Sequence, residues 1–383
     1  MWPSSGDDGR DLAYDGRMLR ATPLLILAAC ASARPGFGER EVVGLWVTRW
    51  DYRSAEDVRR IVANCASLGA TDILWQCRGA ADAYYRSSLE PWGAQIGGKD
   101  PGFDPLETAI AEARAKGVRI HAWMNAMPLW RGKEPPPADA MAAKHPEWIV
   151  VGRDGRRQAP SDHYLCANPA NDEWVAHLVA VVRDVAARYD VDGIHLDYIR
   201  FLEGDFSYDR PTLDRFGFAT GKSPDEAPEA WTQFRRDLVT RVVELAREAA
   251  GRKLFTAAVY PTAEARRRIH QDAERWVRDG LVDAVWPMQY REKNSDFEPM
   301  AADARAAFGD KAFSGLGVFV HKSAERTGEQ IDLVRKLGAK GFALFCYQDF
   351  FETGRSDFGE KAPGEELRAA RRTLLKEKLH GRP

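Results

Sequence analysis

The stretch that decides the fold contains KLFTAAVYP (253–261), VDAVWPMQY (282–290), KAFSGLGVFV (311–320) and KGFALFCYQDF (340–350). These strand-like runs begin at residues 253, 282, 311 and 340, so each start lies 29 residues after the previous one. Segments with helical periodicity fill the intervals between them. Because parallel strands are joined by long crossover connections, this alternation predicts a parallel sheet with helices between its strands.

The same alternation extends toward the N-terminus, to about residue 40. Strand-like segments occupy 42–50, 70–78, 118–126 and 191–201, and helix-like segments occupy 54–69, 104–117, 171–189 and 231–251. Eight strand–helix units favour closure, so we predict an α/β protein with a single (βα)₈ TIM barrel over residues 38–383. A doubly wound sheet is the alternative. The first strand is not followed by G-x-G-x-x-G, so nucleotide binding has no support.

A long connection follows the third strand. It runs from about residue 127 to 171 and contains the segments EPPP and HPEW. In a barrel, this connection lies on the C-terminal face, where active sites are built. Trp148, Asp162 and Tyr164 favour a lobe that faces the substrate, and a variable surface insertion is the alternative. A second irregular stretch, 202–228, follows the fourth strand.

The N-terminal residues 1–37 are predicted to lie outside the fold. Residues 18–33, MLRATPLLILAACASA, have a positive start, a short apolar run and small residues, as a secretory signal does. Residues 27–30 (LAAC) are similar to a bacterial lipobox, which predicts lipidation of Cys30 and an envelope location. Cleavage after Ala33, giving a periplasmic or extracellular protein, is the alternative. Contact with a membrane is expected only through this lipid.

Charge and cysteine content exclude several classes of partner. The net charge is −2, so no basic field favours nucleic acid. The chain has no C-x-x-C pair, which argues against a zinc or redox motif, and no cofactor is expected. Cys65, Cys77 and Cys346 lie in apolar periodic segments and are expected to be buried, whereas a disulfide pairing stays open.

The alternation of side chains along a strand selects the candidate site. His195 and Asp197 share one face of the fourth strand, whereas His121, Trp123 and Asn125 share one face of the third. Gln76 and Arg78 share a face of the second strand. Polar side chains that converge from three strands are costly to bury without partners, so they are expected to line or support the mouth of a site. His121 and His195 lack a metal-binding spacing and predict a polar network, not a metal site.

Asp197 is the candidate catalytic carboxylate because it lies near the C-terminal end of its strand. A carboxylate there can act as a nucleophile or base, or can stabilise an oxocarbenium ion. The alternative is a structural role, in which Asp197 only pairs with an arginine such as Arg49 or Arg78.

The chain resembles the glycosyl-hydrolase-like family 10 barrels over about residues 41–350. The motifs that carry the resemblance are GLWVTRWD (44–51), CRGAADAYYRSSLEPW (77–92), FDPLETAIAEARAKGVRIHAWMN (103–125), VDGIHLDYIRF (191–201), VWPMQYR (285–291) and GFALFCYQDF (341–350). The resemblance implies a secreted or lipid-anchored hydrolase of polysaccharide, with some members acting on bacterial cell-wall glycan. It assigns the aspartate of the fourth strand to Asp197. The sequence departs from the family pattern at Leu202, where proline is usual, and at Cys77, where a branched apolar residue is common.

A second catalytic carboxylate is not evident, although glycosidases usually need two. Strands five and six end without an acid, so the candidates lie on loops: Asp82, Asp162 and Asp349. Asp82 is preferred because it falls inside a family-like motif. If a substrate acetamido group acted as the nucleophile, one protein carboxylate would suffice, and Asp197 would then be an acid or an orienting group.

The sequence therefore predicts a glycosidase that acts on an extracellular or envelope polysaccharide. Peptidoglycan glycan strands are one candidate substrate. The residues expected to bind substrate are Arg49, Trp50, Arg78, His121, Trp123, Asn125, His195, Tyr198, Arg200, Tyr260, Gln289, Tyr290 and Tyr347. A carbohydrate-binding barrel without turnover is the alternative, and a metal-dependent deacetylase would need a ligand cluster that the sequence does not offer. The oligomeric state stays open.

Overall fold

A computed structural model describes residues 36–352 and 363–380, which belong to one compact unit, Arg34–Pro383. Its main sheet has eight parallel strands in the order β8-β7-β6-β3-β2-β1-β10-β9. The strands are β1 Val42–Val47, β2 Asp72–Arg78, β3 Arg119–Asn125, β6 Gly193–Asp197, β7 Leu254–Val259, β8 Ala284–Pro287, β9 Ser314–Gly317 and β10 Gly341–Phe345. Two parallel bridges, Val285–Ala312 and Met288–Gly315, join the β8 and β9 segments. The predicted (βα)₈ barrel is confirmed.

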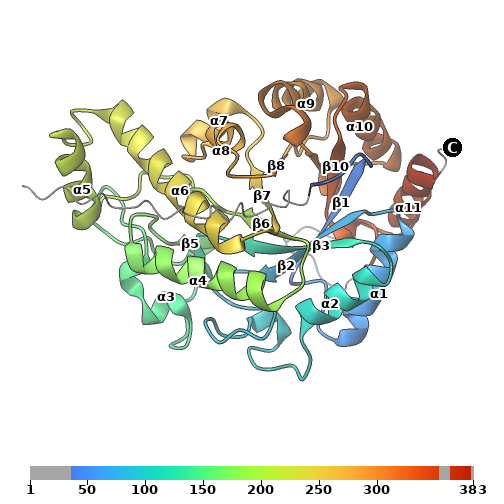
Figure 1. The fold of residues 1–383 in the computed structure, drawn as a ribbon, viewed down its shortest axis with the longest axis horizontal. Helices are drawn as coiled ribbons and strands as arrows, with labels where there is room; N and C mark the ends of the chain where they lie inside the picture. The colour runs from blue at the N-terminus through green and yellow to red at the C-terminus, as the bar shows by residue number, and fades with distance from the viewer. Residues whose placement is uncertain (1–35, 353–362, 381–383) are drawn as a thin grey trace, which may run out of the picture. The chain divides into compact units, whose positions relative to one another are not determined.

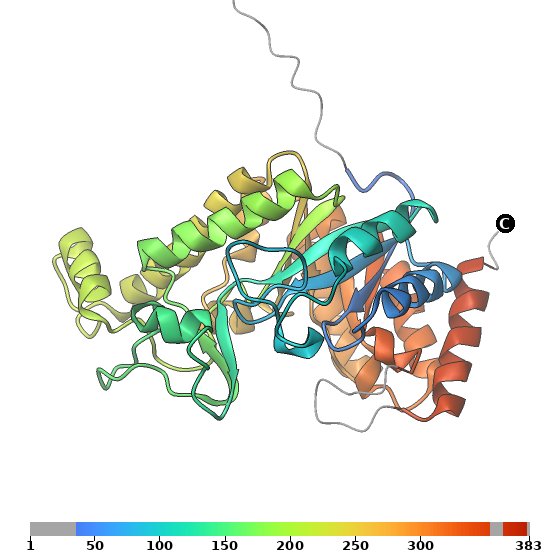
Figure 2. The same ribbon diagram turned by 90° about the horizontal axis from the view of Figure 1, so that it is seen from below.

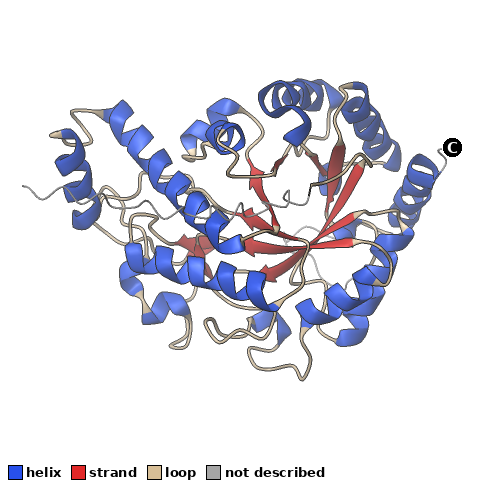
Figure 3. Cartoon of the chain, in the orientation of Figure 1, coloured by secondary structure: helices blue, strands red, loops and turns tan. Residues whose placement is uncertain are grey.

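The helices surround the strands (Figure 1 and Figure 3). They are α1 Ala55–Ser67, α2 Pro105–Arg114, α3 Met141–Lys144, α4 Asp172–Arg188, α5 Arg210–Thr220, α6 Pro228–Ala250, α7 Ala263–Arg268, α8 Ala273–Arg278, α9 Asn294–Phe308, α10 Ala324–Lys336 and α11 Glu365–His380. Side chains cap several of their N-termini: Ser54 and Asp57 form a reciprocal capping box on α1, and Asp104 caps α2. None of the described helices has the length and apolar character needed to span a membrane.

The inside of the barrel is filled mainly by aromatic side chains. Trp46, Trp123 and Trp286 are almost completely buried there, and the Trp46 and Trp286 rings meet edge to face with centroids 5.9 Å apart. Small residues on other strands leave room for these rings. A Cβ atom on Gly44 would lie 2.7 Å from Trp286, and one on Gly315 would lie 3.2 Å from Trp46. The glycines therefore permit an interior of indoles, where branched aliphatic residues are usual.

Phe37, one residue before the predicted boundary at residue 38, packs against residues at the base of the barrel. Its ring meets Phe313 edge to face with centroids 4.7 Å apart and stacks on His121 at 5.9 Å. Its carbonyl accepts a hydrogen bond from Arg119. Residue 37 is thus part of the fold, whereas the predicted signal segment and Cys30 lie outside the described residues.

The insertion after β3 contains a small antiparallel sheet of two strands, β4 Pro128–Gly132 and β5 Ser161–Cys166. Figure 2 shows this green lobe extending to one side of the barrel strands. The stretch 202–228, expected to be irregular, contains α5, whose first turn is capped by the Asp209 side chain. The sequence predicts neither the small sheet nor α5, because the polar residues of these segments show no clear periodicity.

The four cysteines in the described part of the chain, Cys65, Cys77, Cys166 and Cys346, are buried, and none of them forms a disulfide. The expectation that Cys65, Cys77 and Cys346 are buried is confirmed. Burial raises the pKa of the Cys65, Cys77 and Cys166 thiols above the usual value. They pack as small apolar side chains.

We predict that Gly44→Ala destabilises the protein by about 1–3 kcal/mol, because the new methyl group would overlap Trp286 and Ala343. Urea unfolding of the purified variant measures this change. Gly364→Ala is the matched control, since a Cβ there meets no atom within 4 Å. Equal stability of the two variants would show that the interior can rearrange to accept the methyl group.

Candidate active site

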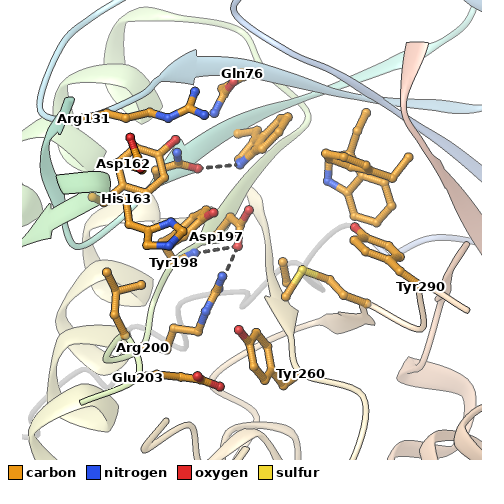
Figure 4. A pocket seen from close by; sticks show the side chains of 18 of the residues that line it. Gln76, Arg131, Asp162, His163, Asp197, Tyr198, Arg200, Glu203, Tyr260 and Tyr290 are labelled. Carbon is orange, nitrogen blue, oxygen red and sulfur yellow. Dashed lines mark hydrogen bonds and ion pairs between the residues drawn. The ribbon is translucent and has the colours of Figure 1, made fainter. Parts of the chain in front are cut away.

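A cavity of about 940 Å³ opens at the C-terminal ends of the strands (Figure 4). Two groups of residues form its walls. The strand ends and the loops that follow them contribute Trp46, Gln76, Trp123, Asn125, Asp197, Tyr198, Arg200, Leu202, Glu203, Ala258, Tyr260, Met288, Tyr290, Phe319 and Phe345; the insertion contributes Arg131, Gln158, Ser161, Asp162, His163 and Tyr164. The cavity lies where active sites of this fold are found, and aromatic rings make up much of its surface.

Asp197 is the last residue of β6 and lies near the centre of this cavity (Figure 4). Its Oδ1 accepts hydrogen bonds from the backbone N–H of Tyr198 at 2.6 Å and from Arg200 Nη1 at 3.0 Å. Both bonds end on Oδ1, so Oδ2 is the oxygen that remains for a substrate. Burial alone would lower the pKa of Arg200, but the Asp197 charge outweighs it and the pKa lies above its usual value.

The backbone turns sharply after Asp197. Tyr198 has a φ of 50°, in the left-handed region that a tyrosine rarely adopts. The turn is held from β3, because the Asp197 carbonyl accepts the N–H of Ala126 at 2.7 Å. Strained residues of this kind cluster at functional sites, where neighbouring structure fixes them. The position of the Asp197 carboxylate is therefore well determined.

Asn125 presents a hydrogen-bond donor to the cavity. The Trp123 indole N–H donates to Asn125 Oδ1 at 3.0 Å, and an indole nitrogen cannot accept a bond in return. This contact fixes which end of the amide is the oxygen. Asn125 is 1% exposed, and its Nδ2 has no hydrogen-bond partner among the described residues. A buried donor without a partner is costly, so a ligand acceptor at this position would be favourable.

Tyr290 adds a neutral hydroxyl to the wall. Burial and the charge of Asp197 hold the pKa of this phenol well above its usual value. Its ring stacks on Phe345 with centroids 5.4 Å apart. Tyr260 and Tyr198 both lie close to the Arg200 guanidinium, whose carbon is 5.0 Å and 4.1 Å from the ring centroids. The cavity thus combines flat apolar surfaces with hydrogen-bonding groups, as sugar-binding sites do.

The insertion forms the opposite wall, as expected for a lobe that faces the cavity. Tyr164 packs edge to face on Tyr198 with ring centroids 4.9 Å apart, and Arg49 Nη2 donates to its hydroxyl at 3.1 Å. Arg131 lies beside Tyr164 on the paired strand. Arg131 and His163 were not selected in the sequence, because nothing local showed which face of the insertion would meet the barrel.

Among the described residues, two carboxylates besides Asp197 line the cavity. Asp162 lies 3.1 Å from Lys133 Nζ, and Glu203 lies 3.0 Å from Arg268 Nη2. The Asp162 and Glu203 side chains are each 69% exposed, so both can exchange protons with solvent. Asp162 was among the predicted candidates, whereas Glu203 was missed because it follows the strand on an irregular loop.

The structure does not favour the other two predicted acids. Asp82 lines a neighbouring cavity, and its oxygens accept the Ala80 N–H at 2.6 Å and the Tyr84 hydroxyl at 3.1 Å. Asp349 is buried away from the site beside Arg371, with its Oδ2 accepting the Cys346 N–H. Burial raises the pKa of Asp349 to about 6. Asp82 thus lies outside the cavity that contains Asp197, and its role as the partner acid stays a prediction.

Arg78 is predicted to bind substrate, but it does not line the main cavity. The pairing of β2 with β3 shifts at Cys77, so Arg78 does not share the face of Gln76. Arg78 instead forms a fully buried ion pair with Glu90 at 2.6 Å and donates to the carbonyls of Asn125 and Ala126. It supports the end of β3 from outside the barrel.

Several other predicted contacts lie outside the cavity. The two histidines form a polar network below it: His121 bonds to Asp72 at 2.7 Å and His195 to Thr256 at 2.9 Å. Gln289 points outward and donates to the Met300 carbonyl. Successive side chains of an extended segment face opposite ways, and here Tyr290 is the one that faces the cavity. Tyr347 lies in a short 3₁₀ turn after β10 and accepts a hydrogen bond from Asn64.

Arg49 and Trp50 lie beside the cavity. The Arg49 guanidinium carbon lies 3.5 Å from the Trp50 ring centroid, and Arg49 lines the neighbouring cavity. The predicted residues that the structure does bring together around the main cavity are Trp123, Asn125, Asp197, Tyr198, Arg200, Tyr260 and Tyr290. Over residues 36–352 and 363–380, no three His, Cys, Asp or Glu side chains are grouped so that they could hold a metal ion.

Comparison with known proteins gives consistent matches. The sequence model of the family described as Glycosyl hydrolase-like 10 matches residues 41–309. Glycosyl hydrolase YngK of Bacillus subtilis is 24% identical over 297 residues, which are 66% of this chain and 54% of that protein. Glycosyl hydrolase DigH of Escherichia coli K12 is 25% identical over 251 residues, 58% of this chain and 55% of that protein. The chain spans about half the length of these curated relatives.

Solved structures share the fold at low sequence identity. Alpha-L-fucosidase isoenzyme 2 from Paenibacillus thiaminolyticus has a TM-score of 0.62 and 14% identity, covering 89% of this chain and 49% of that chain. The PgaB (BpsB) glycoside hydrolase domain from Bordetella bronchiseptica has a TM-score of 0.60 and 14% identity. The match covers 80% of this chain and 94% of that chain. These similarities support the barrel architecture.

The Arg78–Glu90 pair predicts a pH-dependent stability. Burial would raise the pKa of Glu90, but the Arg78 charge and the His177 hydrogen bond outweigh it and lower the pKa to about 2. Because the folded-state pKa is below the unfolded value of about 4.5, the stabilisation is present above pH 4.5 and is lost as the pH falls toward 2.

Glu90→Gln should therefore lower stability at pH 7 by about 3–5 kcal/mol, since Arg78 would stay buried without its counter-charge. It should also flatten the pH dependence between pH 5 and 2. Urea unfolding across this range measures both effects, and Glu377→Gln on the exposed side of α11 is the control. If Glu90→Gln were as stable as the parent at pH 7, the Arg78–Glu90 pair would not be a stabilising ion pair.

Proposed function

Because the chain belongs to the Glycosyl hydrolase-like 10 family, we propose that it hydrolyses glycosidic bonds of an extracellular or cell-envelope polysaccharide, with peptidoglycan glycan strands as the first candidate. The observation that carries this proposal is the Asp197 carboxylate, fixed at the C-terminal mouth of the barrel in an aromatic-walled cavity of about 940 Å³. Cavities of roughly 300–1,000 Å³ enclose ligands larger than one sugar unit.

Asp197 is suited to act on the anomeric centre. Its Oδ1 is held by Arg200 and the Tyr198 N–H, so Oδ2 is oriented toward the substrate without further reorganisation. In the reaction, a carboxylate oxygen either bonds to the anomeric carbon or removes a proton from the attacking water, while positive charge develops on the sugar ring. The Asn125 amide and the Tyr290 hydroxyl are placed to donate hydrogen bonds to sugar oxygens.

The leaving-group oxygen needs a proton as its bond to the anomeric carbon breaks. Asp162 and Glu203 line the same cavity and are open to solvent, so each can supply that proton. If the substrate has an acetamido group, its carbonyl oxygen can replace the protein nucleophile. Asp197 would then orient that group or act as the acid.

Asp197→Asn should reduce the release of sugar fragments by about 10³-fold or more, because the amide can neither bond to the anomeric carbon nor accept a proton. The assay compares parent and variant on purified peptidoglycan and on a panel of polysaccharides. Asp303→Asn, on the exposed side of α9, is the matched control. If parent and variant both bind glycan and neither releases fragments, the protein is a carbohydrate-binding barrel without turnover.

A second comparison identifies the acid among Asp162→Asn, Glu203→Gln and Asp82→Asn. One of the first two variants should lose the high-pH limb of the pH–rate profile, because that limb reports deprotonation of the general acid. Asp82→Asn should keep both limbs, since Asp82 lies in the neighbouring cavity. Unchanged profiles for Asp162→Asn and Glu203→Gln would point to substrate-assisted chemistry with Asp197 as the acid.

A further inference from the structure

A second, smaller cavity of about 220 Å³ lies between the loop after β2 and the insertion. Its walls include Trp92, Trp130, Arg49, Arg131, Asp82 and Gln95. We propose that this cavity is a second glycan subsite. When a glycan lies with the bond to be cleaved at Asp197, this subsite binds an uncharged sugar unit further along the same glycan. The inference rests on the proposed function and extends it from a single site to a groove that binds a polymer.

The two cavities share a wall. Arg131 lines both of them, and Figure 4 shows its side chain extending toward Gln76 at the edge of the main cavity. Arg49 lines the smaller cavity, yet its backbone N–H donates to Gln76 Oε1 at 3.0 Å and its Nη2 to the Tyr164 hydroxyl at 3.1 Å. Gln76 and Tyr164 both line the main cavity, so the two cavities are adjacent, and the proposed glycan would pass Arg131 between them.

The chemistry of the smaller cavity matches a sugar. Two indoles offer flat faces for the C–H side of a pyranose ring, and carboxylate, amide and guanidinium groups offer partners for its hydroxyls. Two arginines, Arg49 and Arg131, are balanced by two carboxylates, Asp82 and Asp139, among the lining residues. This balance favours an uncharged unit over a uronate or a phosphate.

The groups that would hold the sugar are already fixed. The Trp130 indole N–H donates to the Glu134 carbonyl at 2.9 Å, which orients the ring. Asp82 is held by the Ala80 N–H and the Tyr84 hydroxyl. The Trp92 backbone forms a parallel bridge with Ala83. Because little side-chain freedom is lost on binding, even a small cavity can contribute measurably to affinity.

The test measures binding of peptidoglycan glycan strands, fractionated by number of sugars, to the Asp197→Asn protein. Affinity should rise at the strand length that reaches the second cavity. Trp92→Ala should weaken binding of these longer strands by about fivefold, through loss of one aromatic contact, and leave shorter strands unaffected. Ala94→Trp, at an exposed position of the same wall, should produce the same loss by filling the cavity.

Phe218→Ala is the control, because Phe218 on α5 is 96% exposed and lines neither cavity. Ala94→Trp keeps the test decisive if Trp92→Ala does not fold. If the longer strands bind both variants as tightly as the parent while wild-type protein still cleaves them, the subsite is overturned and the glycosidase assignment stands. If the wild type releases nothing and the Asp197→Asn protein binds no strand of any length, the proposed function itself fails.

Discussion

The packing of indoles against glycines inside the barrel is the constraint on which the site depends. Trp46, Trp123 and Trp286 occupy an interior that eight strands enclose, and Gly44 and Gly315 leave space for two of these rings. Close packing leaves such an interior little freedom to move. Trp46 and Trp123 also form part of the cavity surface, so the floor of the site and the core of the barrel are the same layer of side chains. Through its indole N–H, Trp123 further fixes the orientation of the Asn125 amide.

Charged groups brace the rim from both sides of β3. Outside the barrel, the buried Arg78–Glu90 pair holds the carbonyls of Asn125 and Ala126. Inside it, Arg200 holds the Asp197 carboxylate, and the N–H of Ala126 bonds to the Asp197 carbonyl. Taking such charges out of water is costly, and the cost is offset only when their hydrogen bonds are made. Loss of one partner at this rim should therefore affect both stability and the position of Asp197.

The alternation of side chains along a strand was enough to predict which residues of β3 and β6 line the main cavity. It placed Trp123, Asn125 and Asp197 on inward faces, and the repeated strand–helix pattern gave the barrel that the structure confirms. The same rule failed at Arg78, because the shift in pairing at Cys77 reverses the face. It also failed at Tyr347, because β10 ends at Phe345 and the chain turns away. Such departures depend on contacts between segments distant in sequence, which a local pattern does not contain.

The insertion could be located from the sequence, but its effect on the site could not. Arg131 and Tyr164 are paired across β4 and β5, and this pairing fixes both against the barrel mouth before any ligand arrives. An unpaired loop of the same length would lose conformational entropy when it closed on a glycan, whereas paired strands lose it during folding. Without the insertion, the strand ends and their loops would leave the region around Asp197 open on the side that the insertion now covers. With Arg131 lining two cavities, the insertion adds a second compartment on the same wall. Under the proposed function, selectivity for glycan length would then depend on the insertion, whereas bond cleavage would depend on residues at the strand ends.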